Sequence, residues 1–149
     1  MIATAILLAT QSAVAPSMIV SPEQMGAALT ICRDQIAAPL FDRATLPRSG
    51  WPKVMSQGPD TAGNEMTTFR HPTTMLMITL VSGPEQPSEC TVMAPIGPSL
   101  TPQLAAKQAT VLFGKPKRQQ WQTDSATVGQ SPMSSAGISF KFTKKALQQ

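Results

Sequence analysis

Residues 74–81, Thr-Met-Leu-Met-Ile-Thr-Leu-Val, carry no charge and are apolar on both alternating faces. Leu76, Ile78 and Leu80 would lie on one face of an extended chain, and Met75 and Met77 on the other. Successive side chains of a strand point to opposite sides, so this pattern is typical of a strand covered on both faces. We predict that residues 74–81 form the central strand of a sheet.

Two segments carry the signals of a helix start. Ser21-Pro22-Glu23-Gln24 offers a capping serine, a proline for the first helical position and a glutamine that completes a capping box. Thr101-Pro102 repeats the first part of this pattern, and Pro39 and Gly114 mark the expected ends. The inner faces predicted from helical spacing are Met25, Ala28, Leu29, Cys32 and Ile36 in the first helix and Leu104, Ala105, Gln108, Val111 and Leu112 in the second.

Further strands are predicted at residues 64–70, 89–96, 117–124 and 137–143. The last of these alternates most clearly, with Ile138, Phe140 and Phe142 inward and polar residues between them. Residues 39–63 and 125–136 read as irregular loops, the first anchored to the core by Phe41, Leu46, Trp51 and Val54. Residues 82–88, rich in proline and glycine, predict a hairpin loop. The pattern indicates an α+β fold in which two helices pack on one face of an antiparallel sheet of about five strands, in the order α-β-β-β-α-β-β.

The chain has two cysteines, Cys32 and Cys90, and both fall on predicted inner faces. Two cysteines in an exported chain usually pair, and this pair would fasten the first helix to the sheet through a ring of about 60 residues. The alternative is two buried free thiols in a reducing compartment. Their spacing lacks the Cys-x-x-Cys pattern of redox-active pairs, so we predict a structural disulfide.

Residues 1–20 contain no charged residue and resemble an export signal. An apolar stretch at residues 2–9 is followed by Ala13-Val14-Ala15, which has the form of a cleavage site. No Lys or Arg precedes the apolar stretch, and Pro16 would follow the cut, so an ordered N-terminal element is the alternative. We expect an export signal or extension at residues 1–20, a single domain at residues 21–149, no membrane span after processing, and a periplasmic or secreted location.

The composition, 42% hydrophobic and 13% charged, is that of a globular chain. Charge is uneven, because residues 107–149 hold seven of the twelve Lys and Arg residues and only one acid, Asp124. If the last two predicted strands pair, these cations could form one patch beside Trp121; its members are Lys115, Lys117, Arg118, Lys141, Lys144 and Lys145. Such a patch suits a partner with an acidic surface or an anionic component of the cell envelope, although a merely solvated basic face has the same composition. Export argues against a nucleic-acid partner.

Signals for catalysis are weak. His71 is the single histidine, and the nearest carboxylates that could assist it are Asp60 and Glu65. The chain has no Gly-x-Ser-x-Gly motif and no glycine-rich phosphate loop. Trp51, in the long loop, is either a core residue or an aromatic that contacts a ligand.

No metal site or cofactor is expected either. Met66, His71, Met75 and Met77 lie close in sequence and could bind copper(I), but methionines in an apolar strand more often fill gaps in a core. We therefore predict a small exported binding module without catalytic activity, with Lys115, Lys117, Arg118, Trp121, Lys141 and Trp51 as candidate binding residues. A hydrolase that uses His71 with a nearby carboxylate is the alternative.

Overall fold

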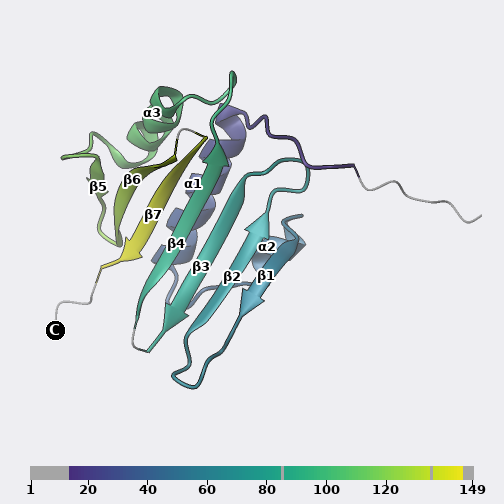
Figure 1. Cartoon of the computed structure of the whole chain (residues 1–149). Helices are drawn as coiled ribbons and strands as arrows, with labels where there is room; N and C mark the ends of the chain where they lie inside the picture. The colour runs from purple at the N-terminus through teal and green to yellow at the C-terminus, as the bar shows by residue number, and fades with distance from the viewer. Residues whose placement is uncertain (1–13, 85, 135, 146–149) are drawn as a thin grey trace, which may run out of the picture.

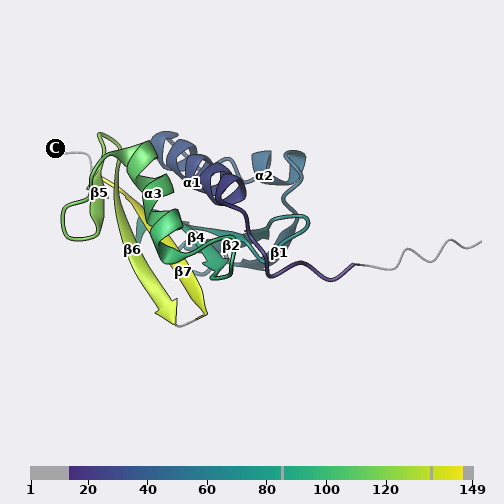
Figure 2. The same ribbon diagram turned by 90° about the horizontal axis from the view of Figure 1, so that it is seen from above.

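A computed structural model of the chain describes residues 14–84, 86–134 and 136–145. Over these residues the fold is one antiparallel seven-stranded sheet in the order β1-β2-β3-β4-β7-β6-β5, with the helices on one face (Figures 1 and 2). The elements are α1 (Pro22–Ala37), α2 (Thr45–Arg48), β1 (Lys53–Gln57), β2 (Glu65–Arg70), β3 (Met77–Gly83), β4 (Gln86–Pro95), α3 (Pro102–Phe113), β5 (Gln120–Gln122), β6 (Ala126–Ser134) and β7 (Gly137–Lys144). The predicted class, an α+β fold with two main helices on one face of an antiparallel sheet, is confirmed.

The first helix begins and ends where the sequence indicates. The Ser21 hydroxyl accepts a hydrogen bond from the Gln24 backbone N–H at 3.2 Å, and the Gln24 side chain accepts from the Ser21 N–H at 2.9 Å. This capping box satisfies two of the N–H groups that a helix start leaves without partners. The helix stops at Ala37, ahead of Pro39, and its predicted inner stripe is buried.

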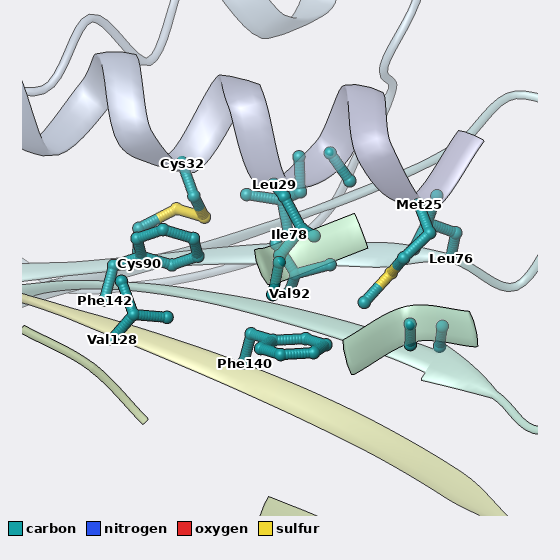
Figure 3. Packing of buried hydrophobic residues seen from close by; sticks show 14 of the residues in the cluster. Met25, Leu29, Cys32, Leu76, Ile78, Cys90, Val92, Val128, Phe140 and Phe142 are labelled. Atoms are coloured by element: carbon teal, nitrogen blue, oxygen red, sulfur yellow. A yellow bond between two sulfur atoms is a disulfide. The ribbon is translucent and has the colours of Figure 1, made fainter. Parts of the chain in front are cut away.

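The disulfide is present and joins α1 to β4. Cys32 and Cys90, 58 residues apart in sequence, are bonded, and neither is exposed. Around them the apolar side chains of α1 meet those of the sheet, as Figure 3 shows for Met25, Leu29, Val92, Phe140 and Phe142. These residues form the main core, and the cross-link lies inside it.

The last strand, β7, is inserted between β4 and β6. Cys90 lies opposite Phe142 and Val92 opposite Phe140, while Val128 of β6 lies opposite Phe142 from the other side. The predicted inward set of β7 (Ile138, Phe140 and Phe142) is buried. The C-terminal strand thus lies next to β4, the middle strand of the sheet.

The strand expected at the centre differs from the prediction in its bounds, its position and its second face. It starts at Met77 and lies between β2 and β4, one place from the middle. Its helix-side residues Ile78 and Leu80 are unexposed, but Met77, Thr79 and Val81 on the opposite face are only half-buried. The described helices lie on the other side, so this second face, here called the open face, is not covered by a helix.

Both predicted loops contain regular structure. The first holds α2 and β1, and the second is mostly β6, which pairs with β5 and β7. In the first loop Leu46 and Trp51 are buried and Phe41 packs against the core, but Val54 is 46% exposed and does not anchor the loop. The expected hairpin loop is shorter than predicted, since Gly83 already pairs with Gln86.

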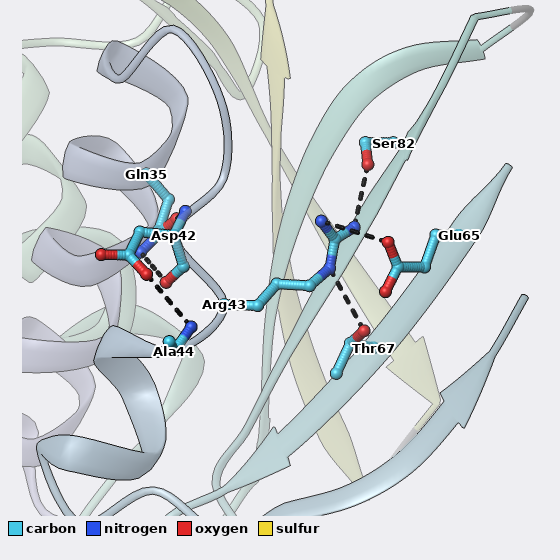
Figure 4. Close-up of polar contacts among 7 residues, drawn as sticks. All are labelled: Gln35, Asp42, Arg43, Ala44, Glu65, Thr67 and Ser82. Atoms are coloured by element: carbon cyan, nitrogen blue, oxygen red, sulfur yellow. Dashed lines mark hydrogen bonds and ion pairs between the residues drawn. The ribbon is translucent and has the colours of Figure 1, made fainter. Parts of the chain in front are cut away.

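A polar cluster holds the connection between α1 and β1 against the sheet (Figure 4). The Arg43 guanidinium donates to the Thr67 hydroxyl at 3.2 Å and to the Ser82 hydroxyl at 2.9 Å, and lies 3.6 Å from the Glu65 carboxylate. The Gln35 side chain accepts from the Asp42 backbone N–H at 2.9 Å. The arginine therefore fastens the connection to β2 and β3.

The inner face predicted for the second helix is partly wrong. Ala105 and Ala109 are the buried residues of α3, whereas Leu104 is 39% and Val111 76% exposed. A side chain added at Gly26 of α1 would place its Cβ 3.1 Å from the Gln108 amide oxygen, which shows how closely the helices approach. Small residues on the inner face allow this approach. None of the helices in the described part of the chain has the length and apolar character needed to cross a bilayer.

The packed domain reaches back to Ser17. The Ser17 N–H donates to the Thr73 carbonyl at 2.9 Å, the Met75 N–H donates to the Ser17 carbonyl at 2.8 Å, and Val20 is buried. The apolar stretch of the predicted export signal, and Ala13 of its cleavage site, lie outside the described residues.

Candidate binding site

The loop between α3 and β5 is held in a tight, unusual turn. α3 ends at Gly114, whose N–H donates to the Thr110 carbonyl at 2.9 Å. Lys117 and Gln120 then exchange backbone hydrogen bonds of 2.7 and 2.9 Å, and the two residues between them, Arg118 and Gln119, have φ values of 52° and 63°. Two positive φ angles in a two-residue hairpin define a type I′ turn, which normally contains Asn or Gly.

This turn carries a strained backbone and exposed positive charge. A side-chain-bearing residue in the left-handed region costs about 1–2 kcal/mol, and here two adjacent residues adopt it. Lys115, Lys117 and Arg118 are exposed, and no carboxylate of the described residues forms an ion pair with them. The turn therefore presents three cations to solvent at the edge of the sheet.

A pocket of about 320 Å³ lies between α3 and the β5–β6 edge, next to this turn. Its walls include Gln103 and Ala106 of α3, Pro116 and Gln119 of the loop, Trp121 of β5 and Gln130 of β6. The pocket is thus lined by three glutamine residues, which can both donate and accept hydrogen bonds. Its volume lies at the lower end of the range found for small-molecule sites.

Trp121 gives this pocket its most distinctive feature. The side chain is 1% exposed and packs beside Phe140, with ring centroids 5.9 Å apart. Its indole Nε1 is buried and has no hydrogen-bond partner among the described residues. A buried donor without an acceptor costs about 1–3 kcal/mol, so such a group calls for an explanation. The same ring forms part of the pocket wall.

The basic patch predicted from the sequence is divided by the fold. The patch was expected to form if the last two predicted strands, which correspond to β5 and β7, paired with each other. They do not pair, because β6 lies between them. Lys141 is on the open face, 3.4 Å from the Glu89 carboxylate. Lys144 donates to the backbone carbonyls of residues 38 and 39, at 3.0 and 3.2 Å, and so caps the end of α1. The structure brings together only Lys115, Lys117, Arg118 and Trp121 from the predicted site.

Trp51 is part of a separate cluster. It is 6% exposed and meets His71 edge to face, with ring centroids 5.3 Å apart. Desolvation in this position lowers the pKa of His71 below its ordinary value, and the ring Nδ1 accepts from the Thr73 N–H at 3.3 Å. The tryptophan therefore occupies the core role that the sequence left open.

The carboxylates proposed to assist His71 lie at the far end of β2. Glu65 begins this strand and His71 follows its last residue, so about 20 Å of extended chain separates them. Asp60 accepts hydrogen bonds from the backbone and side chain of Asn64, which lower the pKa of its carboxyl group. The structure does not assemble the predicted histidine–carboxylate pair.

The predicted methionine group is also divided. Met75 and Met77 line one depression on the open face, Met66 lines another, and His71 packs against Trp51. Among the described residues no group of three or more His, Cys, Asp or Glu side chains is arranged to hold a metal ion.

No family model, curated protein or solved structure matches this chain. The sequence identified the cations Lys115, Lys117 and Arg118 together with Trp121. It placed residues 117–119 in a strand, whereas they lie in the turn before β5, and it gave no signal for the pocket glutamines. Gln130 could be placed only once β6 was recognised as a strand, because its partner Phe140 fixes which face it occupies.

Proposed function

We propose that the chain is an exported binding domain of the cell envelope that recognises an anionic partner through the turn at residues 115–118 and the Trp121 pocket. The observation that carries the proposal is a pocket lined by Trp121, whose indole N–H is buried and unpartnered, beside three cations that form no ion pair among the described residues. A pocket wall that carries an indole donor, with positive charge around it, suits a carboxylate or phosphate group.

The cross-link supports the proposed location. Disulfides form and persist in oxidising compartments such as the periplasm and the extracellular space, and are rare in the cytosol. The Cys32–Cys90 bond is buried in the core, where it acts as a structural tie. A domain cross-linked in its core, with a charged turn exposed at the edge of its sheet, is consistent with a binding module.

The strain in the turn is a second support. Left-handed residues other than glycine persist where the surrounding structure holds them, and they often occur at functional positions. Here the strained pair places Arg118 at the tip of the hairpin and Gln119 in the pocket wall. The same two residues thus connect the cationic turn to the pocket.

A charge-reversal experiment tests the proposal. Lys117→Glu/Arg118→Glu changes the net charge by the same amount as the control Arg48→Glu/Lys53→Glu, whose residues are exposed and lie on α2 and β1, with β1 at the opposite edge of the sheet from β5. We compare how the oxidised proteins bind to vesicles with and without anionic lipid, at low and high salt. Affinity recovery under the same salt conditions measures their binding to soluble envelope proteins. We expect the first variant to lose at least tenfold in binding and the control to lose less than threefold.

The two outcomes separate specific from general attraction. Equal losses in both variants would mean that net charge alone drives the association, which contradicts a site at the turn.

Trp121→Phe removes the indole N–H and keeps an aromatic ring, so it should weaken binding of a ligand that accepts from this donor. Unchanged affinity in that variant would remove the pocket from the proposal.

A further inference from the structure

The open face of the sheet carries a cluster of methionines that the proposed binding site does not use. Met77 and Met93 lie directly opposite each other in the register of β3 and β4. The Cβ atoms of such cross-strand pairs are about 4.5–5.5 Å apart, so the two side chains are neighbours. This pair forms the base of the cluster.

The N-terminal segment adds the remaining members. Ser17 pairs with the chain at Thr74 through hydrogen bonds of 2.8 and 2.9 Å, which brings Met18 next to Met75. Met18, Met75, Met77 and Met93 all line one depression of about 230 Å³. Its other walls are alanine, proline and glycine residues, which bring no polar side chain. Among the described residues that line the depression, the thioethers are therefore the only side-chain groups able to bind a metal.

Gap filling does not account for this arrangement. Met25 is a core methionine with no exposure, whereas Met18 is 60% exposed and Met75, Met77 and Met93 are half-buried. Their side chains border solvent, where filling a gap brings little packing energy. The flexible methionine side chain, with three rotatable bonds, can instead turn several sulfur atoms toward one point.

The other types of soft donor in the chain, thiol and imidazole, are engaged elsewhere. Both cysteines of the chain are tied in the disulfide, and the single histidine packs against Trp51. Thioether sulfur suits Cu(I), while Mg²⁺ and Ca²⁺ prefer oxygen ligands and Zn²⁺ prefers thiolate, imidazole or carboxylate. We propose that Met18, Met75, Met77 and Met93 form a binding site for a soft monovalent cation of the Cu(I) type. This revises the expectation from the sequence that the chain holds no metal.

Silver(I) is a suitable probe because it has the same charge and softness and remains in one oxidation state in air. The full, unreduced chain is titrated with Ag(I) by calorimetry, and with Cu(I) in competition with a coloured Cu(I) chelator. The test variant is Met77→Leu/Met93→Leu. Leucine nearly conserves the volume of methionine, so the fold should be retained, and circular dichroism checks that it is.

A matched control removes the same number of sulfur atoms elsewhere. Met55 and Met66 lie on β1 and β2, outside the depression, and the control is Met55→Leu/Met66→Leu. We expect one equivalent of Ag(I) in the wild type and the control, and at least a tenfold weaker affinity in the test variant. Zn²⁺ should show no uptake above background.

Three results would overturn the proposal. They are the absence of saturable Ag(I) uptake by the wild type, an equal loss of affinity in test and control variants, and undiminished uptake by the variant in which all four methionines are leucine. Each can occur whether or not the turn at residues 115–118 binds an anionic partner, because the two sites share no residue.

Discussion

Removal of the disulfide should lower the stability of the protein by an amount that can be worked out from its position. The Cys32→Ala/Cys90→Ala variant opens a loop whose ends are 58 residues apart. On the chain-entropy model, a loop of this length contributes about 4 kcal/mol at 25 °C, because the cross-link restricts the unfolded chain. Domains of this size are stable by about 5–15 kcal/mol, so the loss is a large share of the total.

The assay is urea unfolding of the oxidised wild type and the variant, followed by circular dichroism. With a slope of about 2 kcal/mol per molar urea, a loss of 4 kcal/mol lowers the midpoint by about 2 M. The reduced wild type is the control, because it loses the cross-link but keeps both sulfur atoms. The reduced wild type should show most of the decrease in the urea midpoint. The midpoint of the alanine variant should be slightly lower still, because this variant also loses buried packing.

A midpoint that falls by less than about 0.5 M would refute this reasoning. It would mean that the contacts between α1 and the sheet hold equally well without the bond, or that the unfolded chain is already compact. Mass measurement of the unreduced protein confirms the oxidation state before each experiment.

Three further predictions concern residues that belong to neither proposed site. In Gly83→Ala the new Cβ would lie 2.9 Å from the Asn64 Cα, so we expect a loss of about 1–3 kcal/mol in urea unfolding, against no measurable change for Gly97→Ala, where the Cβ meets no atom within 4 Å. Lys144→Met removes the hydrogen bonds to the two carbonyls that follow the last residue of α1 and should cost about 1 kcal/mol; an unchanged midpoint would show that this cap is not needed. Burial lowers the pKa of His71 in the folded state, so the unfolded chain binds more protons as pH falls below about 6.5, and stability should fall with pH there. NMR titration of this single histidine checks the sign, and a midpoint at or above the ordinary value contradicts it.

The parts of the fold that were predicted correctly are those with a local signal strong enough to stand alone. The capping box and the periodic apolar residues locate α1, and the alternation of Ile138, Phe140 and Phe142 locates β7. The disulfide followed from placing both cysteines on inner faces. In each case the local pattern and the final burial agree.

The missed strands lack such a signal because their neighbours determine them. All five residues of β1 are exposed, since it is an edge strand paired on one side, so no alternation in burial marks it. Among the residues of β6 whose burial is described, Ala126 and Val128 are the buried apolar ones, and the second half of the strand pairs with β7. Backbone pairing of this kind cannot be read from residue hydrophobicity.

The errors at the second helix and in the basic patch have a different cause. The phase of α3 is set by close approach to α1, which places alanines inward and leaves Leu104 and Val111 exposed. The patch was predicted from sequence clustering of cations, but the insertion of β6 and the capping role of Lys144 separate its members. The burial of the α3 residues and the separation of the cations both depend on how elements distant in sequence pack together. A single sequence carries little information about such packing.

The placement of β7 has a consequence for how the chain is made. β7 follows the other six strands of the sheet in the chain and fills the slot between β4 and β6, so neither of these two strands has its second neighbour until β7 has been synthesised. A nascent or truncated chain ending before Gly137 would expose two long unpaired edges, which are templates for aggregation.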